Sequence, residues 1–277
     1  MTAELGPNRY GKSAIRLVRV DRSGAAHRVR DLNVAISLEG DFAASYVDGD
    51  NSLVVATDTM KNTAYALAAE HLTGSIEAYA TALGRHFLRD PQVATATVTI
   101  SELAWRPIGS APDAFTRDHS SARTCVVACS VDGVVVDAGI ADLVVLKTTK
   151  SAFSGFPRDE FTTLPETDDR LLATKVTAVW RYVDGAPVDY DASFDAVSRT
   201  LLDVFAEHYS VSVQASIWII GRAIIERHPE VLEVTLTLPN LHHWTADIER
   251  FGIPNDRKVY VSTTEPHGLI QATVRRG

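Results

Sequence analysis

The order of secondary structure that the sequence predicts occurs twice along the chain. In each half, extended segments are followed by two segments with apolar residues at helical spacing, and then by extended segments again. The clearest alternating segments, typical of strands with one buried face, are 13–20, 93–105, 173–183 and 233–244. Consecutive strands joined by short turns pair in antiparallel fashion. We therefore expect an α+β fold of two tandem domains, residues 8–147 and 148–277, with helices on one face of each antiparallel sheet.

The predicted helices have recognisable starts. Asp58 stands where an N-cap residue belongs, and the apolar residues after it recur at helical spacing. Ser75 has the same place before a second helix, whose expected buried stripe is Ile76, Tyr79, Ala80, Leu83 and Phe87. In the second half, one helix is expected around 194–205 and a more apolar one over 213–228.

The segments between these helices and strands are expected to be loops or extended chain. After a turn at 21–24 we expect extended chain to about residue 57, and we expect a long loop over the polar segment 107–122. The pair Asp132-Gly133 predicts a hairpin between two apolar strands. A sheet covered by helices on one face leaves the other face to be buried, which favours oligomerisation.

Composition limits the classes of function. The chain has 277 residues and 45% hydrophobic residues, enough for a sizeable core. Its net charge of −8 argues against nucleic-acid binding, which needs a basic field, but leaves room for a small anion held by a few local cations.

The cysteines and the chain ends bear on the compartment. Cys125 and Cys129 fall on one face of a strand, too far apart for a disulfide, so we expect reduced packing residues. The first residues lack the apolar core of a signal peptide, no stretch approaches the roughly 20 apolar residues of a membrane span, and the last residues lack a Ser-Lys-Leu signal. We expect a cytoplasmic protein.

Asn240 and His242 are candidate ligand-facing residues. Period-2 alternation places them on one face of a strand and His243 on the other. They are either the polar end of a strand that emerges into solvent or an amide and an imidazole that face a ligand. The adjacent histidines point apart and have no third ligand nearby in sequence, so we expect no metal site.

Two helix starts are candidates for binding an anion or a carbonyl oxygen. Backbone N–H groups at Val213-Gln214 and at Thr57-Asp58 have no partner within their helices, and the helix dipole lies behind them. The alternative is ordinary capping, by Ser210 or Ser212 at the first of these sites. Lys61 in the first turn slightly opposes the dipole, so that turn is not optimised for helix stability alone.

Three further residues each have an ordinary structural explanation when they are considered alone. Arg170 follows two acids and could form a surface ion pair, Phe153 could be a core aromatic, and Lys12 could be a solvated lysine at the start of a strand. The sequence contains neither a glycine-rich phosphate loop nor a Ser-His-Asp signature.

Residues 143–170, LVVLKTTKSAFSGFPRDEFTTLPETDDR, resemble the signature segment of the urate oxidase (uricase) family. The match lies in the spacing of Lys147-Thr148-Thr149, Ser151, Phe153, Phe156, Phe161, Leu164 and Arg170. The segments YGK, VATDTMKNT, VQA, LPNLHHW and PHGLIQATV also occur in the order and at the separations of that family. The resemblance covers nearly the whole chain, from about residue 8 to residue 276.

The resemblance implies a fold and an activity. The fold would be the tunnelling fold (T-fold), present twice per chain, with the sheets of paired subunits closing into a barrel and two such dimers stacking into a homotetramer. The activity would be oxidation of urate by O₂ to 5-hydroxyisourate and hydrogen peroxide, without a metal or organic cofactor. Each active site would lie between two subunits.

The resemblance also implies roles for particular residues. One chain would contribute the substrate-binding residues and one catalytic residue, namely Phe153, Arg170, Val213, Gln214, Asn240 and His242. Its neighbour would contribute the catalytic residues Lys12 and Thr57, together with Asp58 as a substrate-binding residue. These residue types suit urate, a flat purine anion, since Phe153 offers a stacking face, Arg170 two parallel N–H donors, and Gln214 a donor and an acceptor.

A proton relay would address the slow reaction of triplet O₂ with a closed-shell molecule, because a second deprotonation makes urate a better electron donor. Thr57 with a neutral Lys12 could pass that proton, and His242 could extend the relay and position water. Asn240 could hold O₂ or that water over the purine plane. Two alternatives remain: a zinc-dependent pterin or purine hydrolase of the same superfold, and a purine-binding module without catalysis.

Overall fold

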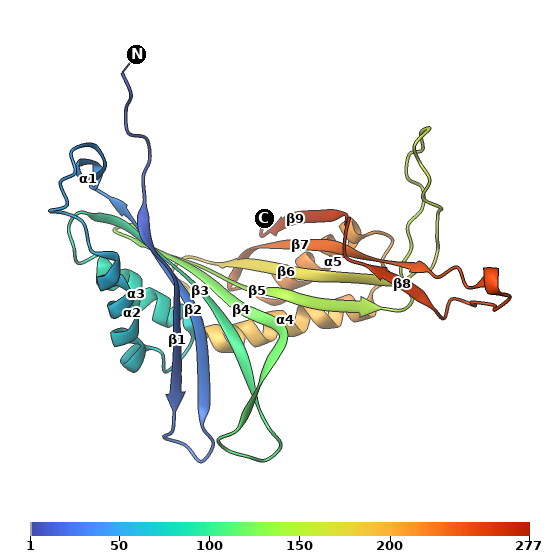
Figure 1. Cartoon of the computed structure of the whole chain (residues 1–277), viewed down its shortest axis with the longest axis horizontal. Coiled ribbons are helices and arrows are strands. Elements are labelled where there is room, and N and C mark those ends of the chain that lie inside the picture. The colour runs from blue at the N-terminus through green and yellow to red at the C-terminus, as the bar shows by residue number, and fades with distance from the viewer. Residues whose placement is uncertain (1) are drawn as a thin grey trace. The chain divides into compact units, whose positions relative to one another are not determined.

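The computed structural model describes residues 2–277, and its elements alternate between long antiparallel strands and paired helices (Figure 1). The strands are β1 (Tyr10–Asp21), β2 (Arg28–Gly40), β3 (Val93–Pro107), β4 (Phe115–Ser130), β5 (Gly133–Lys147), β6 (Leu172–Tyr182), β7 (Val231–Thr245), β8 (Tyr260–Thr263) and β9 (Leu269–Arg275). The helices are α1 (Ala43–Val47), α2 (Thr57–His71), α3 (Ile76–Phe87), α4 (Tyr190–Glu207), α5 (Val213–Arg227) and the 3₁₀ helix η1 (Glu249–Phe251).

Consecutive strands are hydrogen-bonded neighbours from β1 to β8, and β9 pairs with β7. In residues 2–277 this path does not close on itself. The chain forms two compact units, the first made of residues 1–139 and 180–194, and the second of residues 140–179 and 195–277. The domain boundary expected at residue 147 coincides with the end of β5 and stays a prediction.

In the first unit, α2 and α3 pack on the antiparallel strands β1 to β4. The expected start of α3 is confirmed, because the Ser75 side chain accepts a hydrogen bond from the Ala78 N–H. The expected stripe of α3 is confirmed as well, since all five of its residues are buried. Cys125 and Cys129 are buried free thiols, and burial raises the pKa of both.

Three local expectations for the first unit were wrong. The N-cap of α2 is Ala56, so Asp58 is the second helical residue and its carboxylate bonds to Lys61 and Asn62. The chain before α2 is not extended throughout, because it forms the short helix α1. The expected loop over 107–122 shrinks to 108–114, because β3 and β4 continue to pair as far as Pro107 and Phe115 despite their polar sequence.

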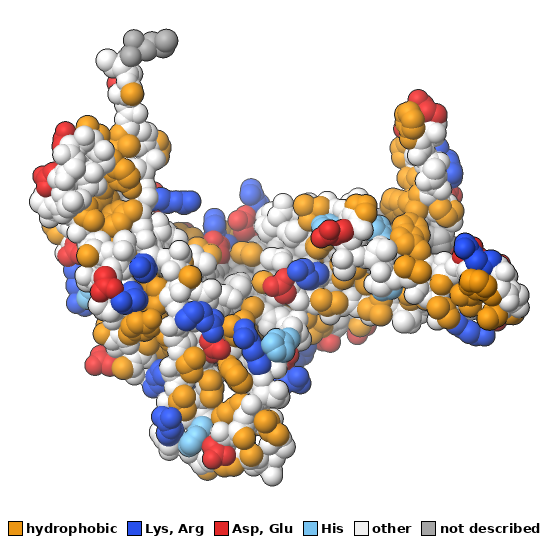
Figure 2. Space-filling view, viewed as in Figure 1, with side chains coloured by type: hydrophobic (Ala, Val, Ile, Leu, Met, Phe, Trp, Pro, Cys, Tyr) orange, Lys and Arg blue, Asp and Glu red, His pale blue; other side chains and the backbone are white. Residues whose placement is uncertain are grey.

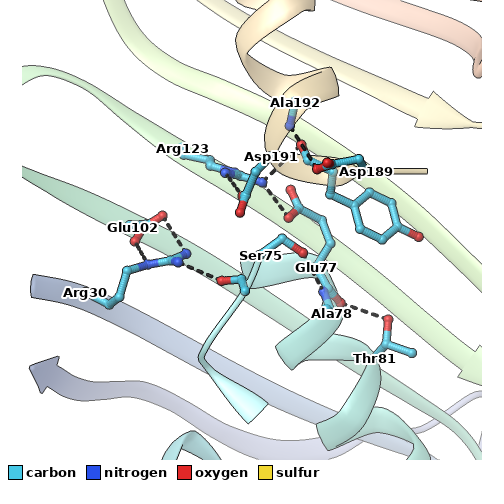
Figure 3. Close-up of polar contacts among 12 residues, drawn as sticks. Arg30, Ser75, Glu77, Ala78, Thr81, Glu102, Arg123, Asp189, Asp191 and Ala192 are labelled. Atoms are coloured by element: carbon cyan, nitrogen blue, oxygen red, sulfur yellow. Dashed lines mark hydrogen bonds and ion pairs between the residues drawn. The ribbon is translucent and has the colours of Figure 1, made fainter. Parts of the chain in front are cut away.

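A buried ion network links α3, β4 and the start of α4 in the first unit (Figure 3). The Arg123 side chain donates to the Glu77 carboxylate at 2.7 Å and to Asp191, and it lies 4.5 Å from the centre of the Phe194 ring. Glu77 is fully buried, and burial raises the pKa of its carboxyl group although Arg123 opposes the shift. The charged pair lies on the side of α3 that contacts the sheet, where its loss would leave a buried charge unpaired.

In the second unit, α5 packs on β7 and β9. Its buried residues are mostly aliphatic and lie on one side, while Trp218 on the other side is 56% exposed. The Lys147 ammonium at the end of β5 donates to the carbonyls of Phe205 and His208, which satisfies the C-terminal end of α4. The order strand, helix, helix, strand thus places the start of α5 next to β7.

The second unit also carries exposed apolar side chains. On β5, Val144 and Leu146 are 57% and 52% exposed, whereas Val145 between them is buried. Apolar side chains also cover the loop within 150–170 and the hairpin between β7 and β8 that contains η1, where Phe161 and Phe251 are 81% and 72% exposed (Figures 1 and 2). Within residues 2–277 no helix is both long and apolar enough to cross a membrane.

Candidate active site

A pocket of about 320 Å³ lies in the second unit and gathers six of the predicted site residues. These six are Phe153, Arg170, Val213, Gln214, Asn240 and His242. They come from the 150–170 loop, the start of α5 and the middle of β7. Asp169, Trp244, Arg257 and Tyr260 also line the pocket.

The loop that carries Phe153 and Arg170 is held by backbone hydrogen bonds. Phe153 and Thr167 exchange two of them, at 2.8 and 3.0 Å. The backbone N–H of Arg170 donates to the carbonyl of Ser151 at 2.8 Å. The Phe153 ring is stacked on Phe156 at 4.9 Å between centroids, and the Arg170 guanidinium carbon lies 5.3 Å from the Phe153 centroid. The aromatic ring and the cation are therefore fixed side by side.

Arg170 is a half-buried cation without an ion-pair partner among residues 2–277. Its Nε atom is buried and makes no hydrogen bond, and burial lowers the pKa of the guanidinium. An arginine stays charged even so. The possibility of a surface ion pair with the preceding acids is excluded for Asp169, whose carboxylate accepts from the Thr149 hydroxyl and pairs with Arg257 instead. Arg170 can thus attract an anion into the pocket.

The start of α5 supplies neutral donors. Ser212 is the N-cap, and its side chain accepts from the Ala215 N–H at 3.1 Å. This bond leaves the backbone N–H groups of Val213 and Gln214 at the helix start without a bond in the described structure. The Gln214 side chain is exposed at the pocket. Capping and ligand binding are therefore compatible at this helix start.

Asn240 and His242 lie where β7 changes its partner. Before this point β7 pairs with β9, and from His242 on it pairs with β8. The Asn240 N–H donates to the carbonyl of Gly268 at 2.8 Å, between the two paired segments. The His242 ring stacks on Trp244 at 5.4 Å, and burial lowers the pKa of the imidazole, helped by the charge of Arg170. A neutral imidazole can accept a proton.

Trp244, Arg257 and Tyr260 are among the pocket residues that the sequence did not predict as site residues. Alternation could have identified Trp244, since it stands two positions after His242 on the same face of β7. Arg257 lies in the β7–β8 hairpin and Tyr260 is the first residue of β8. The connection between these strands is organised by the buried Asn255 side chain, which bonds to four backbone groups. No signal in the sequence placed that hairpin beside the pocket.

The other three predicted residues belong to the first unit. Lys12 lies next to a β-bulge in β1, between Lys12 and Ile15, and Thr57 is the first residue of α2. The hydrogen bond from Lys61 is the main cause that lowers the pKa of Asp58, and the charge of Lys12 contributes less. Strand β1, which carries Lys12, contacts α2 within this unit.

A phenol joins β1 to the segment before α2. The Tyr10 hydroxyl accepts from the Val55 N–H at 2.8 Å and donates to the Val55 carbonyl at 3.2 Å. The Tyr10 ring packs edge-on against Phe42 at 4.8 Å. Tyr10 stands two residues before Lys12, and Val55 two residues before Thr57, so this contact joins the two segments that carry the predicted catalytic residues.

Fold and pocket together define a class of protein: an antiparallel α+β protein whose second unit can bind a flat anionic heterocycle through an aromatic ring, an unpaired guanidinium and neutral donors. No group of three or more His, Cys, Asp or Glu in residues 2–277 is arranged to hold a metal ion. A sequence profile of the family described as Uricase matches residues 8–128 and 136–271. The chain belongs to the uricase family.

Individual relatives agree with the family match. Uricase from Arthrobacter globiformis is 44% identical over 273 residues, covering 98% of this chain and 90% of that protein. Uricase from Dictyostelium discoideum is 40% identical over 282 residues, covering 99% and 98%.

Solved structures establish the fold class. The crystal structure of uricase from Arthrobacter globiformis matches with a TM-score of 0.96, 44% identity and coverage of 100% of this chain and 96% of that chain. A uricase structure from Bacillus fastidious matches with a TM-score of 0.85 at 25% identity, covering 99% and 94%. The expected antiparallel α+β T-fold architecture is confirmed.

Proposed function

We propose that this protein oxidises urate with O₂ to 5-hydroxyisourate and hydrogen peroxide. The observation that carries the proposal is the unpaired Arg170 guanidinium beside the Phe153 ring, in a chain of the uricase family. Arginine can give two parallel N–H bonds to one edge of a purine anion. The aromatic face, the Gln214 amide and the Val213 N–H complete a set of contacts that suits a planar ligand with donors and acceptors on its edges.

The reaction balances without another oxidant. Urate loses two electrons, O₂ takes them up with two protons to become hydrogen peroxide, and a water oxygen becomes the hydroxyl group of the product. Lys12 and Thr57 act as the relay that removes a proton from urate, with Thr57 as the donor of its hydroxyl proton to a neutral Lys12. Asn240 holds O₂ or the attacking water above the purine plane, and His242 orients that water.

The proposal includes a homotetramer with active sites between subunits. The exposed apolar side chains of β5, of the 150–170 loop and of the β7–β8 hairpin support it, because contiguous exposed apolar surface is typical of protein interfaces. The open path of the sheet supports it as well, since unpaired strand edges favour association. In this arrangement the first unit of one subunit faces the pocket of its neighbour.

One experiment separates this function from the alternatives. Purified protein is mixed with urate in air-saturated, chelator-treated buffer, while urate absorbance, O₂ and hydrogen peroxide are followed. An oxidase consumes one O₂ and forms one peroxide for each urate lost. A hydrolase would be identified by an activity that consumes a purine or pterin without O₂ uptake and that returns when zinc is added. Urate binding without turnover would identify a binding module.

A further inference from the structure

A buried hydrogen-bond network lies in the second unit behind the residues that line the pocket. His208 directly follows α4, and its Nδ1 atom lies 2.6 Å from the Val204 carbonyl oxygen. A carbonyl oxygen only accepts, so Nδ1 carries the proton and Nε2 of the neutral ring is an acceptor. The Ser216 hydroxyl, 2.8 Å away, is the donor to Nε2.

The network continues from Ser216 to Ser210. Their hydroxyl oxygens are 2.8 Å apart, and the Ser212 carbonyl lies 3.1 Å from each. Ser216 is 1% exposed and Ser210 is fully buried. Solvent therefore has little access to either hydroxyl, and removal of one partner leaves a buried polar group unpaired at a cost of about 1–3 kcal/mol.

Ser210 carries the network to the pocket loop through its backbone. Its N–H donates to the Lys150 carbonyl at 2.9 Å, and its carbonyl accepts from the Ala152 N–H at 2.7 Å. These two bonds hold Ser151 in a parallel bridge with Ser210. The Ser151 carbonyl accepts from the backbone N–H of Arg170, and Phe153 follows two residues later.

Ser216 carries the network to the start of α5. Its N–H donates to the Ser212 carbonyl, which closes the first turn of the helix. The same turn presents the Val213 and Gln214 N–H groups to the pocket. His208, through two serines, thus connects to the loop that carries Phe153 and Arg170 and to the start of α5.

We propose that His208 is a positioning residue for purine binding, which acts through Ser216 and Ser210 to hold the 150–153 segment, Arg170 and the start of α5 in register. This inference rests on the proposed function. Burial lowers the pKa of His208, the bond to the Val204 carbonyl opposes this shift, and the nearby Lys147 ammonium adds to it, so the net lowering favours the neutral ring that the network needs. The network does not reach Lys12 or Thr57, so it acts on binding rather than on proton transfer.

Two substitutions separate the link to Ser216 from the presence of a polar side chain. In His208→Asn, the amide can still donate to Val204 but cannot reach Ser216. In His208→Gln, the longer side chain can place its carbonyl oxygen near the former Nε2 and accept from Ser216. We expect His208→Asn to raise the Kd for urate, measured calorimetrically without O₂, and the aerobic KM roughly ten-fold, with kcat changed by less than about two-fold. His208→Gln should recover most of the affinity.

His228 offers a matched control in the same unit. Its Nε2 atom lies 2.9 Å from the Thr200 hydroxyl, and it is 8% exposed, but its bonds do not involve the residues of the pocket. His228→Asn should lower the Tm about as much as His208→Asn and leave Kd and KM unchanged.

The outcomes distinguish the two proposals. If the wild-type protein binds no urate, the proposed function fails. The wild-type protein can also bind and oxidise urate while His208→Asn behaves like His228→Asn, with less folded protein and a lower apparent kcat but unchanged Kd and KM. In that case the positioning role of His208 is wrong. Equal affinity losses in His208→Asn and His208→Gln would contradict the link through Ser216.

Discussion

At the scale of single residues, both proposed relay groups lie where the backbone departs from regular structure. Lys12 adjoins the bulge of β1, where Ala14 has a φ of 56°. Thr57 begins α2 behind an N-cap, Ala56, that makes no side-chain cap bond. Bulges and uncapped helix starts cost stability, and such costs are common where side chains must be aimed at a ligand.

The relay predicts non-additive kinetics. Thr57→Ala and Lys12→Met should each lower kcat by about 10²-fold or more, because each removes one step of the same proton transfer. The double variant should be little worse than the more damaged single variant, since residues that act as a unit are not additive. Steady-state rates with urate at saturating O₂ measure this, and multiplied losses in the double variant would mean that the two residues act independently.

Tyr10 predicts a second effect at this scale. Tyr10→Phe keeps the ring against Phe42 but removes both bonds to Val55, so the segments that carry Lys12 and Thr57 lose a bond that joins them. We expect kcat to fall roughly ten-fold with a small change in KM, because misplacement of reacting groups by about 1 Å is costly.

The control for Tyr10 is Tyr46→Phe. The exposed Tyr46 hydroxyl makes one bond to the Arg9 carbonyl near the start of β1, and its loss should leave kcat unchanged. An equal fall in both variants would show that any disturbance of this strand lowers activity, and that the contact with Val55 has no special part.

At the scale of elements, the Glu77–Arg123 pair predicts how α3 is held on the sheet. Arg123→Met leaves Glu77 buried without its cation and should lower the free energy of unfolding by about 3–5 kcal/mol. The double variant Glu77→Leu/Arg123→Met should be more stable than Arg123→Met, because it removes both charges. Breaking the exposed pair of Arg222 and Glu226 on α5 should cost less than about 0.5 kcal/mol.

The pH dependence of the same variant has a definite sign. Burial raises the folded-state pKa of Glu77 above its unfolded value, so its contribution is present at low pH and is lost as pH rises through the folded pKa. Without Arg123 that pKa rises further. Denaturant titrations should therefore show a larger deficit for Arg123→Met at about pH 7 than at about pH 5, and a deficit independent of pH would mean that Glu77 is not the group left unpaired.

The elements also show where periodicity was sufficient and where it was not. It predicted α3 down to its cap and its buried stripe, because Ser75 and the apolar residues act within one helix. It misplaced the start of α2, because the N-cap residue Ala56 has no polar side chain that would indicate an N-cap in the sequence. It predicted a loop over 107–122 because these polar residues have weak strand character, whereas cross-strand pairing extends β3 and β4 into this segment.

At the scale of the whole molecule, the proposed assembly predicts complementation. Thr57 lies in the first unit and Arg170 in the second, and the proposed site takes them from different subunits. Thr57→Ala and Arg170→Ala homo-oligomers should both be nearly inactive. After the two are unfolded and refolded together in equal amounts, about a quarter of the sites should receive an intact Thr57 and an intact Arg170 from different chains.

Activity measured after mixing should therefore rise toward that fraction of the wild-type value, with chain exchange checked by native mass spectrometry. Each variant refolded alone is the control. Confirmed mixing without any return of activity would place Thr57 and Arg170 in a site within one chain and reject the shared site, even for a protein that oxidises urate.

The sequence by itself determined the repeated order of strands and helices, the buried stripes, and the residue types that suit a planar anion. These properties depend on neighbours along the chain, and their spacing is visible in the letters. Only the tertiary structure decided that Arg170 has no carboxylate partner among the described residues, that Trp244, Arg257 and Tyr260 join the pocket, and that His208 lies behind it. Each of these facts depends on contacts between segments far apart in sequence, and periodicity has no information about which distant segments meet.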